Sequence, residues 1–242
     1  MSVVTPSPTR HTVRRLGATL LRLAGIYWAI AVTAVVVANV VGGTVWGSTD
    51  VSIAVYARQS SIWFPFSLAI MLVTSYLRVH VAAGMTRRTF VRASLLVQVA
   101  AGVGYAVALT TLVQVERLVH DALGWSSTIT EIQLTTETSP AWAMALELAV
   151  VFVVGNLCGL LVGATYQRFG GWVGTLTLPL TVGPLVLALY IPGARITDLP
   201  GVWTTTEAGH LGLLVAAGVL LGAAIAAAYR AVVLRLQLAP AS

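Results

Sequence analysis

Four arginines in a segment between two apolar runs are the strongest functional signal in this sequence. Residues 76–92 read YLRVHVAAGMTRRTFVR and contain Arg78, Arg87, Arg88 and Arg92 but no acid. In a membrane protein, a basic segment between apolar runs stays in the cytosol. The segment is therefore either a loop that only orients the chain or a charged surface offered to a cytosolic partner.

The same segment contains residues suited to a tight turn. Gly84 can end the preceding helix in a left-handed conformation, which glycine adopts at little cost. Thr86 can accept a hydrogen bond from the free amides at the start of the following helix. We therefore predict a short, positively charged elbow between two membrane-spanning helices.

Several residue patterns that catalysis and cofactor binding require are missing. The chain has no lysine, so it lacks the P-loop lysine and the amine of a Schiff-base enzyme. Cys158, the one cysteine, lies in an apolar run, and no two histidines have metal-ligand spacing. HExxH and GxSxG are also absent. We expect no catalytic, cofactor or metal site, and no ATP hydrolysis by this chain itself.

Composition places the chain among multi-span membrane proteins. Of its 242 residues, 57% are hydrophobic and 9% are charged, and the mean hydropathy is +0.89. A soluble domain carries about 25% charged residues. The net charge of +6 does not require a nucleic-acid partner, because the arginines adjoin apolar runs and membrane orientation explains them.

Six uncharged runs are each close to the ~20 residues that a helix needs to cross the hydrocarbon core. We predict a single all-α transmembrane domain over residues 1–242 with spans at 23–41, 59–77, 93–115, 148–167, 169–194 and 208–229. Residues 1–9 are polar and predict a disordered tail. The connection 116–140 is the longest and predicts a solvated outer loop.

The segment 10–22 has the pattern of a basic amphipathic helix. Apolar residues recur at helical spacing while Arg14, Arg15 and Arg22 point elsewhere, as in a helix that lies in the inner headgroup layer. The alternative is a simple extension of the first span into the interface.

The charges predict which side of the membrane each end occupies. With six spans and a cytosolic N-terminus, eleven of the fourteen arginines lie inside and all eight acids lie outside or at the outer boundary. Glu147 and His210 fall near predicted outer ends of spans, so we interpret them as interfacial residues. The alternative is a role in transport, since a carboxylate within the membrane usually marks a transport or proton path. Both termini are expected in the cytosol.

The predicted fourth span contains a regular stripe of small residues. Gly155, Gly159 and Gly163 recur every four residues, which lets another helix approach closely. Gly218 and Gly222 repeat the spacing in the last span. The stripe predicts either packing within the bundle or an interface between subunits.

The elbow sequence AAGMTRRTFVR, together with six spans and a basic helix before the first, resembles the permease subunits of bacterial ABC-type exporters of the type-two family. Members often have a glycine, a Ser or Thr, an arginine and a phenylalanine here, matching Gly84, Thr86, Arg87 and Phe90. The resemblance covers the whole chain in topology, but in motif it covers only about residues 76–125. One departure is the brief outer connection 192–209, where members often have a larger element.

The resemblance implies an exporter subunit in the bacterial cytoplasmic membrane that depends on a separate cytosolic ABC ATPase. The coupling residues would be Gly84, Thr86, Arg87, Arg88, Phe90 and Arg92. The N-terminal helix would dock beside them. Two copies, or one copy and a second permease, would line the pathway. A non-transporting membrane protein, such as an anchor or an immunity or sensor component, is the alternative, and an intramembrane enzyme is a third.

Overall fold

The fold is a bundle of long helices, seen in a computed structural model that describes residues 7–49, 51–129, 132, 134–135, 139–190 and 207–236. The elements are α1 (Pro8–Trp46), η1 (Ala54–Tyr56), α2 (Ala57–Ala82), α3 (Arg87–Leu123), α4 (Ala141–Leu176), α5 (Leu178–Tyr190) and α6 (Glu207–Leu234). In the described part of the chain, five helices are long and apolar enough to cross a membrane: α1, α2 with η1, α3, α4 and α6. The chain thus has the helices of a multi-pass membrane protein.

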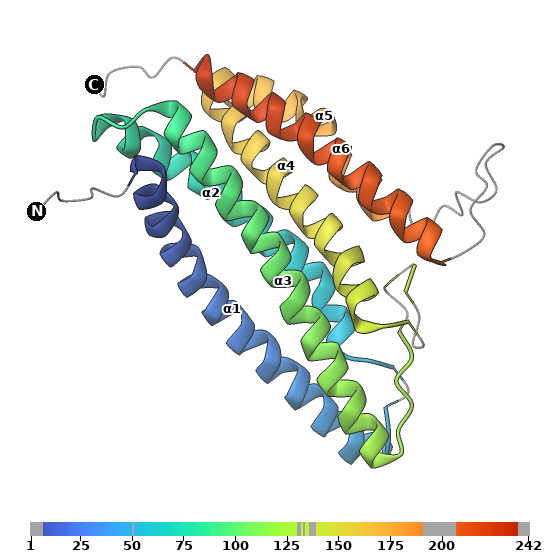
Figure 1. Cartoon of the computed structure of the whole chain (residues 1–242). Coiled ribbons are helices and arrows are strands. Elements are labelled where there is room, and N and C mark those ends of the chain that lie inside the picture. Colours follow the sequence, from blue (N-terminus) through green and yellow to red (C-terminus); the bar gives the residue numbers. More distant parts are fainter. Residues whose placement is uncertain are drawn as a thin grey trace, which may run out of the picture.

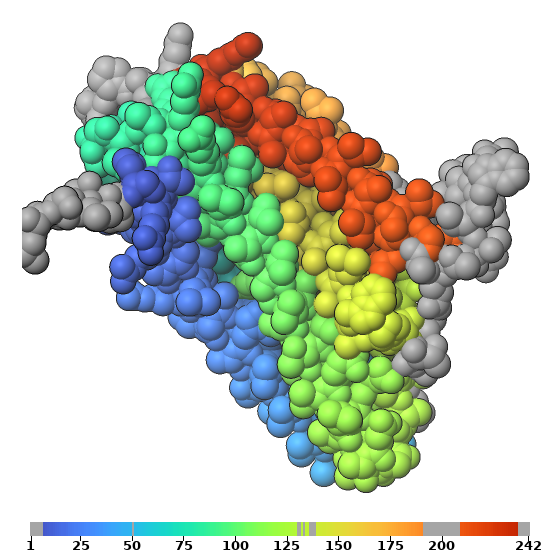
Figure 2. Space-filling view, viewed as in Figure 1, coloured from blue at the N-terminus to red at the C-terminus, as the bar shows by residue number. Residues whose placement is uncertain are grey.

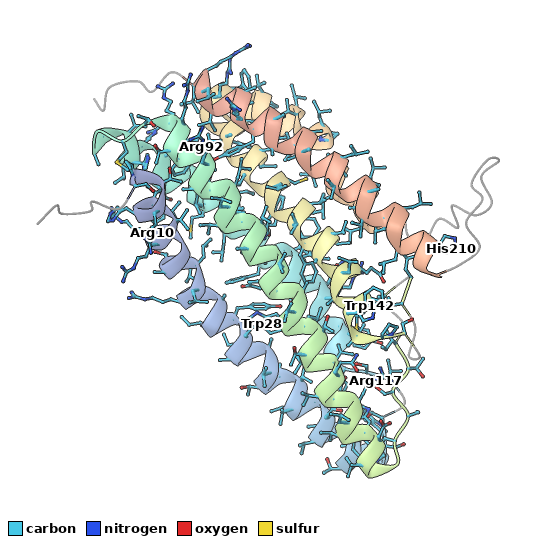
Figure 3. All side chains as sticks on the ribbon, viewed as in Figure 1. Arg10, Trp28, Arg92, Arg117, Trp142 and His210 are labelled. Carbon is cyan, nitrogen blue, oxygen red and sulfur yellow. The ribbon has the colours of Figure 1, made fainter. Side chains whose placement is uncertain are left out.

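The start of α1, the α2–α3 bend and the end of α6 lie at the same end of the bundle (Figure 1). The side chains follow the same division: Arg10 and Arg92 lie at this end, and Arg117, Trp142 and His210 lie toward the other (Figure 3). We call these the elbow end and the far end.

The first helix differs from its prediction. Residues 10–22 are helical, but they continue without a break into the first span, so the chain shows an extension of the span and no separate interfacial helix. Ser7 caps the helix by accepting a hydrogen bond from the Arg10 amide, and Pro8 occupies its first turn. Pro8 and Thr9, predicted to be disordered, are therefore helical, and residues 1–6 lie outside the described residues. Gly17 and Gly25 do not interrupt the helix because both keep helical geometry.

The fourth helix is the centre of the bundle and packs against α2, α3, α5 and α6 (Figure 1). Its glycine stripe lies in these contacts. A Cβ on Gly159 would lie 2.5 Å from the Phe66 carbonyl oxygen, and one on Gly163 would lie 2.9 Å from that of Ile70. Both glycines therefore let α2 and α4 approach closely within one chain, and their face is not available to a second subunit.

The predicted fifth span, 169–194, is not one continuous helix in the structure. Gly170 has φ 80° and ψ −179°, which is not helical, and the chain turns back there. Tyr166 packs over Gly174 and bonds the Thr175 hydroxyl at 3.0 Å, while Leu185 lies against Gly155. The segment after the turn is broken near Thr177 because Pro179 has no amide to donate. Residues 191–194 of this predicted span lie outside the described residues.

The third helix is longer than predicted. It ends at Leu123, so residues 116–123, predicted to begin the solvated outer loop, are helical, and both Glu116 and His120 are buried. Gly124 then closes the helix with φ 70°, and Trp125 packs against Gly43 of α1. The contact with α1 explains the extension, because the last turns of α3 have a partner helix to bury them.

Candidate functional site

The elbow has the local geometry that its residues predict. Gly84 has φ +78°, and the amides of Gly84 and Met85 donate to the carbonyls of Val81 and His80 at 3.0 and 3.2 Å. These two bonds form a Schellman motif that closes the end of α2. Thr86 caps α3 by accepting a hydrogen bond from the Thr89 amide at 3.2 Å. The turn is thus held by hydrogen bonds on both sides and has a defined shape.

The predicted coupling residues divide into surface and interior groups. Gly84, Thr86, Arg88 and Arg92 are exposed, whereas Phe90 is fully buried and packs against His80 with ring centroids 5.4 Å apart. Arg88 and Arg92 lie four residues apart on α3 and therefore point to the same side. Phe90 thus supports the elbow from inside and does not contribute to its surface.

Arg87 is half-buried and has an internal partner. Its guanidinium donates to the Leu234 carbonyl of α6 at 3.4 Å. Arg168, near the end of α4, donates in the same way to the Val232 carbonyl at 3.4 Å. Both arginines bond the last carbonyls of α6, where unpaired acceptors and the negative end of the helix dipole favour cations. The elbow is therefore connected to α6 and, through it, to α4.

The basic surface continues from the elbow onto α1. Arg14, Arg15 and Arg22 are exposed. A hollow of about 260 Å³ lies between the first turns of α1 and the elbow, lined by His11, Arg15 and His80 among others. Among the described residues this end carries no acid, since Glu116, Asp121, Glu147 and Glu207 all belong to the far end. The hollow and the arginines together form a surface that suits an acidic partner.

The far end has a buried polar cluster that the sequence did not predict. Glu116 accepts hydrogen bonds from Asn39 Nδ2 at 2.7 Å, from the Ile53 and Ala54 amides at 3.1 Å, and from the Ser52 hydroxyl. His120, one turn along α3, donates from Nε2 to Asn39 Oδ1 at 2.7 Å. The carboxylate therefore caps the free amides at the start of η1 and ties α1, α3 and the α1–α2 connection together.

Glu147 has a similar structural role. It lies in the second turn of α4, only 2% exposed, and accepts hydrogen bonds from the Leu134 and Thr135 amides at 3.3 and 3.1 Å. The carboxylate thus anchors part of the connection that precedes α4. His210 lies near the start of α6, also at the far end (Figure 3). Neither residue is brought to the elbow.

The described residues contain no group of three or more His, Cys, Asp or Glu side chains that could hold a metal ion.

Comparisons of the chain with protein-family models, with curated proteins and with solved structures gave no match. The elbow combines a turn held by hydrogen bonds with exposed arginines.

Proposed function

We propose that this chain is the membrane-spanning permease subunit of an ATP-driven exporter, and that the elbow docks on a separate cytosolic ATPase. The observation that carries the proposal is a turn of fixed shape that presents Arg88 and Arg92. A loop that only orients the chain needs positive charge but no particular shape. The hydrogen-bonded turn at Gly84 and the cap at Thr86 favour a surface recognised by a folded partner.

The contacts of the elbow also suit the transmission of movement. Phe90 is buried behind it, and Arg87 bonds the end of α6. Arg168 bonds the same end of α6 from α4, the central helix of the bundle. A displacement of the elbow by a closing ATPase would therefore act on α3 and α6 together, and through them on the rest of the bundle.

We further propose six membrane crossings with both ends in the cytosol. Gly155 and Leu185, which lie against each other, are each fifteen residues from Gly170, as expected for an antiparallel helical hairpin. Across the break, the Thr177 and Thr181 amides still donate to carbonyls four residues earlier. Residues 171–190 then form a kinked rod of roughly 30 Å, which matches the hydrocarbon core. With an even number of crossings, the elbow and both ends of the chain would lie on the cytosolic side, where the arginines gather.

Purification from native membranes tests the proposal. The tagged chain is expected to co-purify with a P-loop ATPase identified by mass spectrometry, and the double variant Arg88→Glu with Arg92→Glu is expected to lose it. The matched control reverses Arg230 and Arg235, two exposed arginines of the same membrane end that lie at the end of α6. Purification of the wild-type chain with no ATPase would contradict the exporter function and favour an anchor or sensor component.

A further inference from the structure

A cavity of about 490 Å³ lies between α1 and α3, with α2 at its back. Its walls are mainly small and aliphatic side chains, among them Gly17, Leu20, Ala24, Leu68, Ala101 and Gly104. Trp28 is directed from α1 toward α3 at mid-length of the bundle, and its ring lies 5.5 Å from that of Tyr105 (Figure 3). In Figure 2, α1 forms one flank of the molecule and lies against α3. The volume is in the range of small-molecule sites.

Two residues that line this apolar cavity, Gln98 and Tyr105, have buried polar atoms without a partner. Gln98 is 1% exposed, and neither its Nε2 nor its Oε1 has a hydrogen-bonding partner among the described residues. Tyr105 is 4% exposed, and its hydroxyl is unpartnered in the same way. Burying such groups without hydrogen bonds is costly, and most buried polar groups in proteins are paired. A turn of either side chain toward the cavity would let a ligand there supply the missing partners.

The lining restricts the chemistry of that ligand. No charged residue lines the cavity, so a charged headgroup would have no counter-ion there. The Gln98 amide offers one donor group and one acceptor, which a hydroxyl or an amide can satisfy together. The Tyr105 hydroxyl lies on the same helix face, roughly 10 Å further along α3. At about 30 Å³ per heavy atom, the cavity holds roughly sixteen heavy atoms.

We propose that the α1–α3 cavity binds a neutral single-chain amphiphile, with an alcohol or amide head at Gln98 and its chain along the apolar wall toward Trp28 and Tyr105. The ligand enters from the bilayer that surrounds these helices. This site goes beyond the docking function of the elbow and does not depend on an ATPase.

Quenching of Trp28 fluorescence tests the proposal in phosphatidylcholine nanodiscs. The probes are a tetradecanol with one bromine at mid-chain, which matches the size of the cavity, and the corresponding brominated tetradecane, which lacks the hydroxyl. The Trp28 signal is the difference between the wild type and Trp28→Phe. We expect saturable quenching by the alcohol and about fivefold to tenfold weaker binding of the alkane, since a hydrogen bond contributes about one power of ten at most.

Two pairs of variants separate binding from folding. Gln98→Leu is expected to weaken binding of the alcohol about fivefold to tenfold while raising the unfolding temperature, because it removes unpaired buried polar atoms. Thr110→Val, which removes another unpartnered buried hydroxyl of α3 outside the cavity, leaves binding unchanged. Gly104→Leu fills the cavity and abolishes quenching, whereas Gly25→Leu on an open face of α1 does not.

Three results would overturn the proposal. Equal binding of alcohol and alkane in the wild type would mean that the cavity takes up bulk lipid without selectivity. Unchanged binding in Gln98→Leu would remove the polar anchor. Quenching in Gly104→Leu equal to that of the wild type would place the probe elsewhere.

Discussion

Two glycines of α3, only two residues apart, should respond in opposite ways to the same substitution. A Cβ on Gly102 would lie 2.8 and 2.9 Å from the main-chain N and Cα of Val153 in α4. A Cβ on Gly104 would meet no atom within 4 Å. The pair therefore compares one added methyl group in a tight helix seam with the same group in open space.

The contact distances determine the expected magnitude. Ordinary contact at a Cβ begins at 3.4 Å, so α3 and α4 must move apart by about half an ångström in Gly102→Ala. Overpacking of this kind costs about 1–3 kcal/mol. The gain in helix propensity from Gly to Ala offsets at most about 1 kcal/mol of it. We expect Gly102→Ala to lower the free energy of unfolding by about 1–2 kcal/mol, and Gly104→Ala to raise it by up to about 1 kcal/mol.

Reversible unfolding by SDS in mixed micelles measures both values. The two variants share the helix, the chemistry of the change and the membrane depth, so most detergent effects cancel in the comparison. Equal changes in the two variants, or a stabilised Gly102→Ala, would refute the close approach of α3 and α4 at this point.

Two further predictions concern the far end and the topology. Glu116→Gln should lower the free energy of unfolding by about 2–3 kcal/mol, since an amide NH₂ would face backbone or hydroxyl donors. Asp121→Asn, at an exposed site of the same helix, should change it by less than about 0.5 kcal/mol. Equal stabilities of the two variants in the SDS assay would show that the carboxylate is not a cap. Cysteines introduced at Ser2 or Ser242 should react with an impermeant maleimide only after lysis, and one at Ser48 should react in intact cells; labelling of Ser2→Cys in intact cells would contradict the proposed orientation.

The elbow could be predicted from local sequence because its geometry is local. The turn depends on Gly84, and the cap depends on Thr86 and an amide three residues away. The multi-span membrane character could also be predicted from the sequence, because composition and the length of the apolar runs determine it. Both predictions needed only residues close together in the chain.

The buried polar contacts could not be predicted because they join distant segments. Asn39 lies seventy-seven residues from Glu116, and nothing in the sequence indicates that the two side chains meet. The local sequence therefore predicts a solvated loop at Glu116, where the structure has a buried helical residue. The division of the predicted fifth span also depends on tertiary geometry, since the turn at Gly170 and the break near Pro179 lie within one uncharged run. Gln98, in contrast, has a local signal in the sequence, because it is a polar amide inside an apolar span.

The position of Arg87 alters the design of charge variants at the elbow. Because its guanidinium bonds the Leu234 carbonyl, reversal of Arg87 would disturb α6 as well as any docking surface. Arg88 and Arg92 are exposed, so their reversal changes the surface alone.

ATP turnover of the proposed permease–ATPase complex after reconstitution tests the central claim most directly, with Gly84 as the position varied. Gly84→Val removes no charge, and a Cβ at this position would meet no atom within 4 Å, but the φ of +78° penalises a β-branched residue by about 1–2 kcal/mol. Gly84→Asn keeps the left-handed turn at low cost. We predict that Gly84→Val assembles with the ATPase but loses stimulation of its turnover, while Gly84→Asn behaves as the wild type. Equal stimulation by all three, together with unchanged binding in Arg88→Glu with Arg92→Glu, would show that the elbow only orients the chain in the membrane.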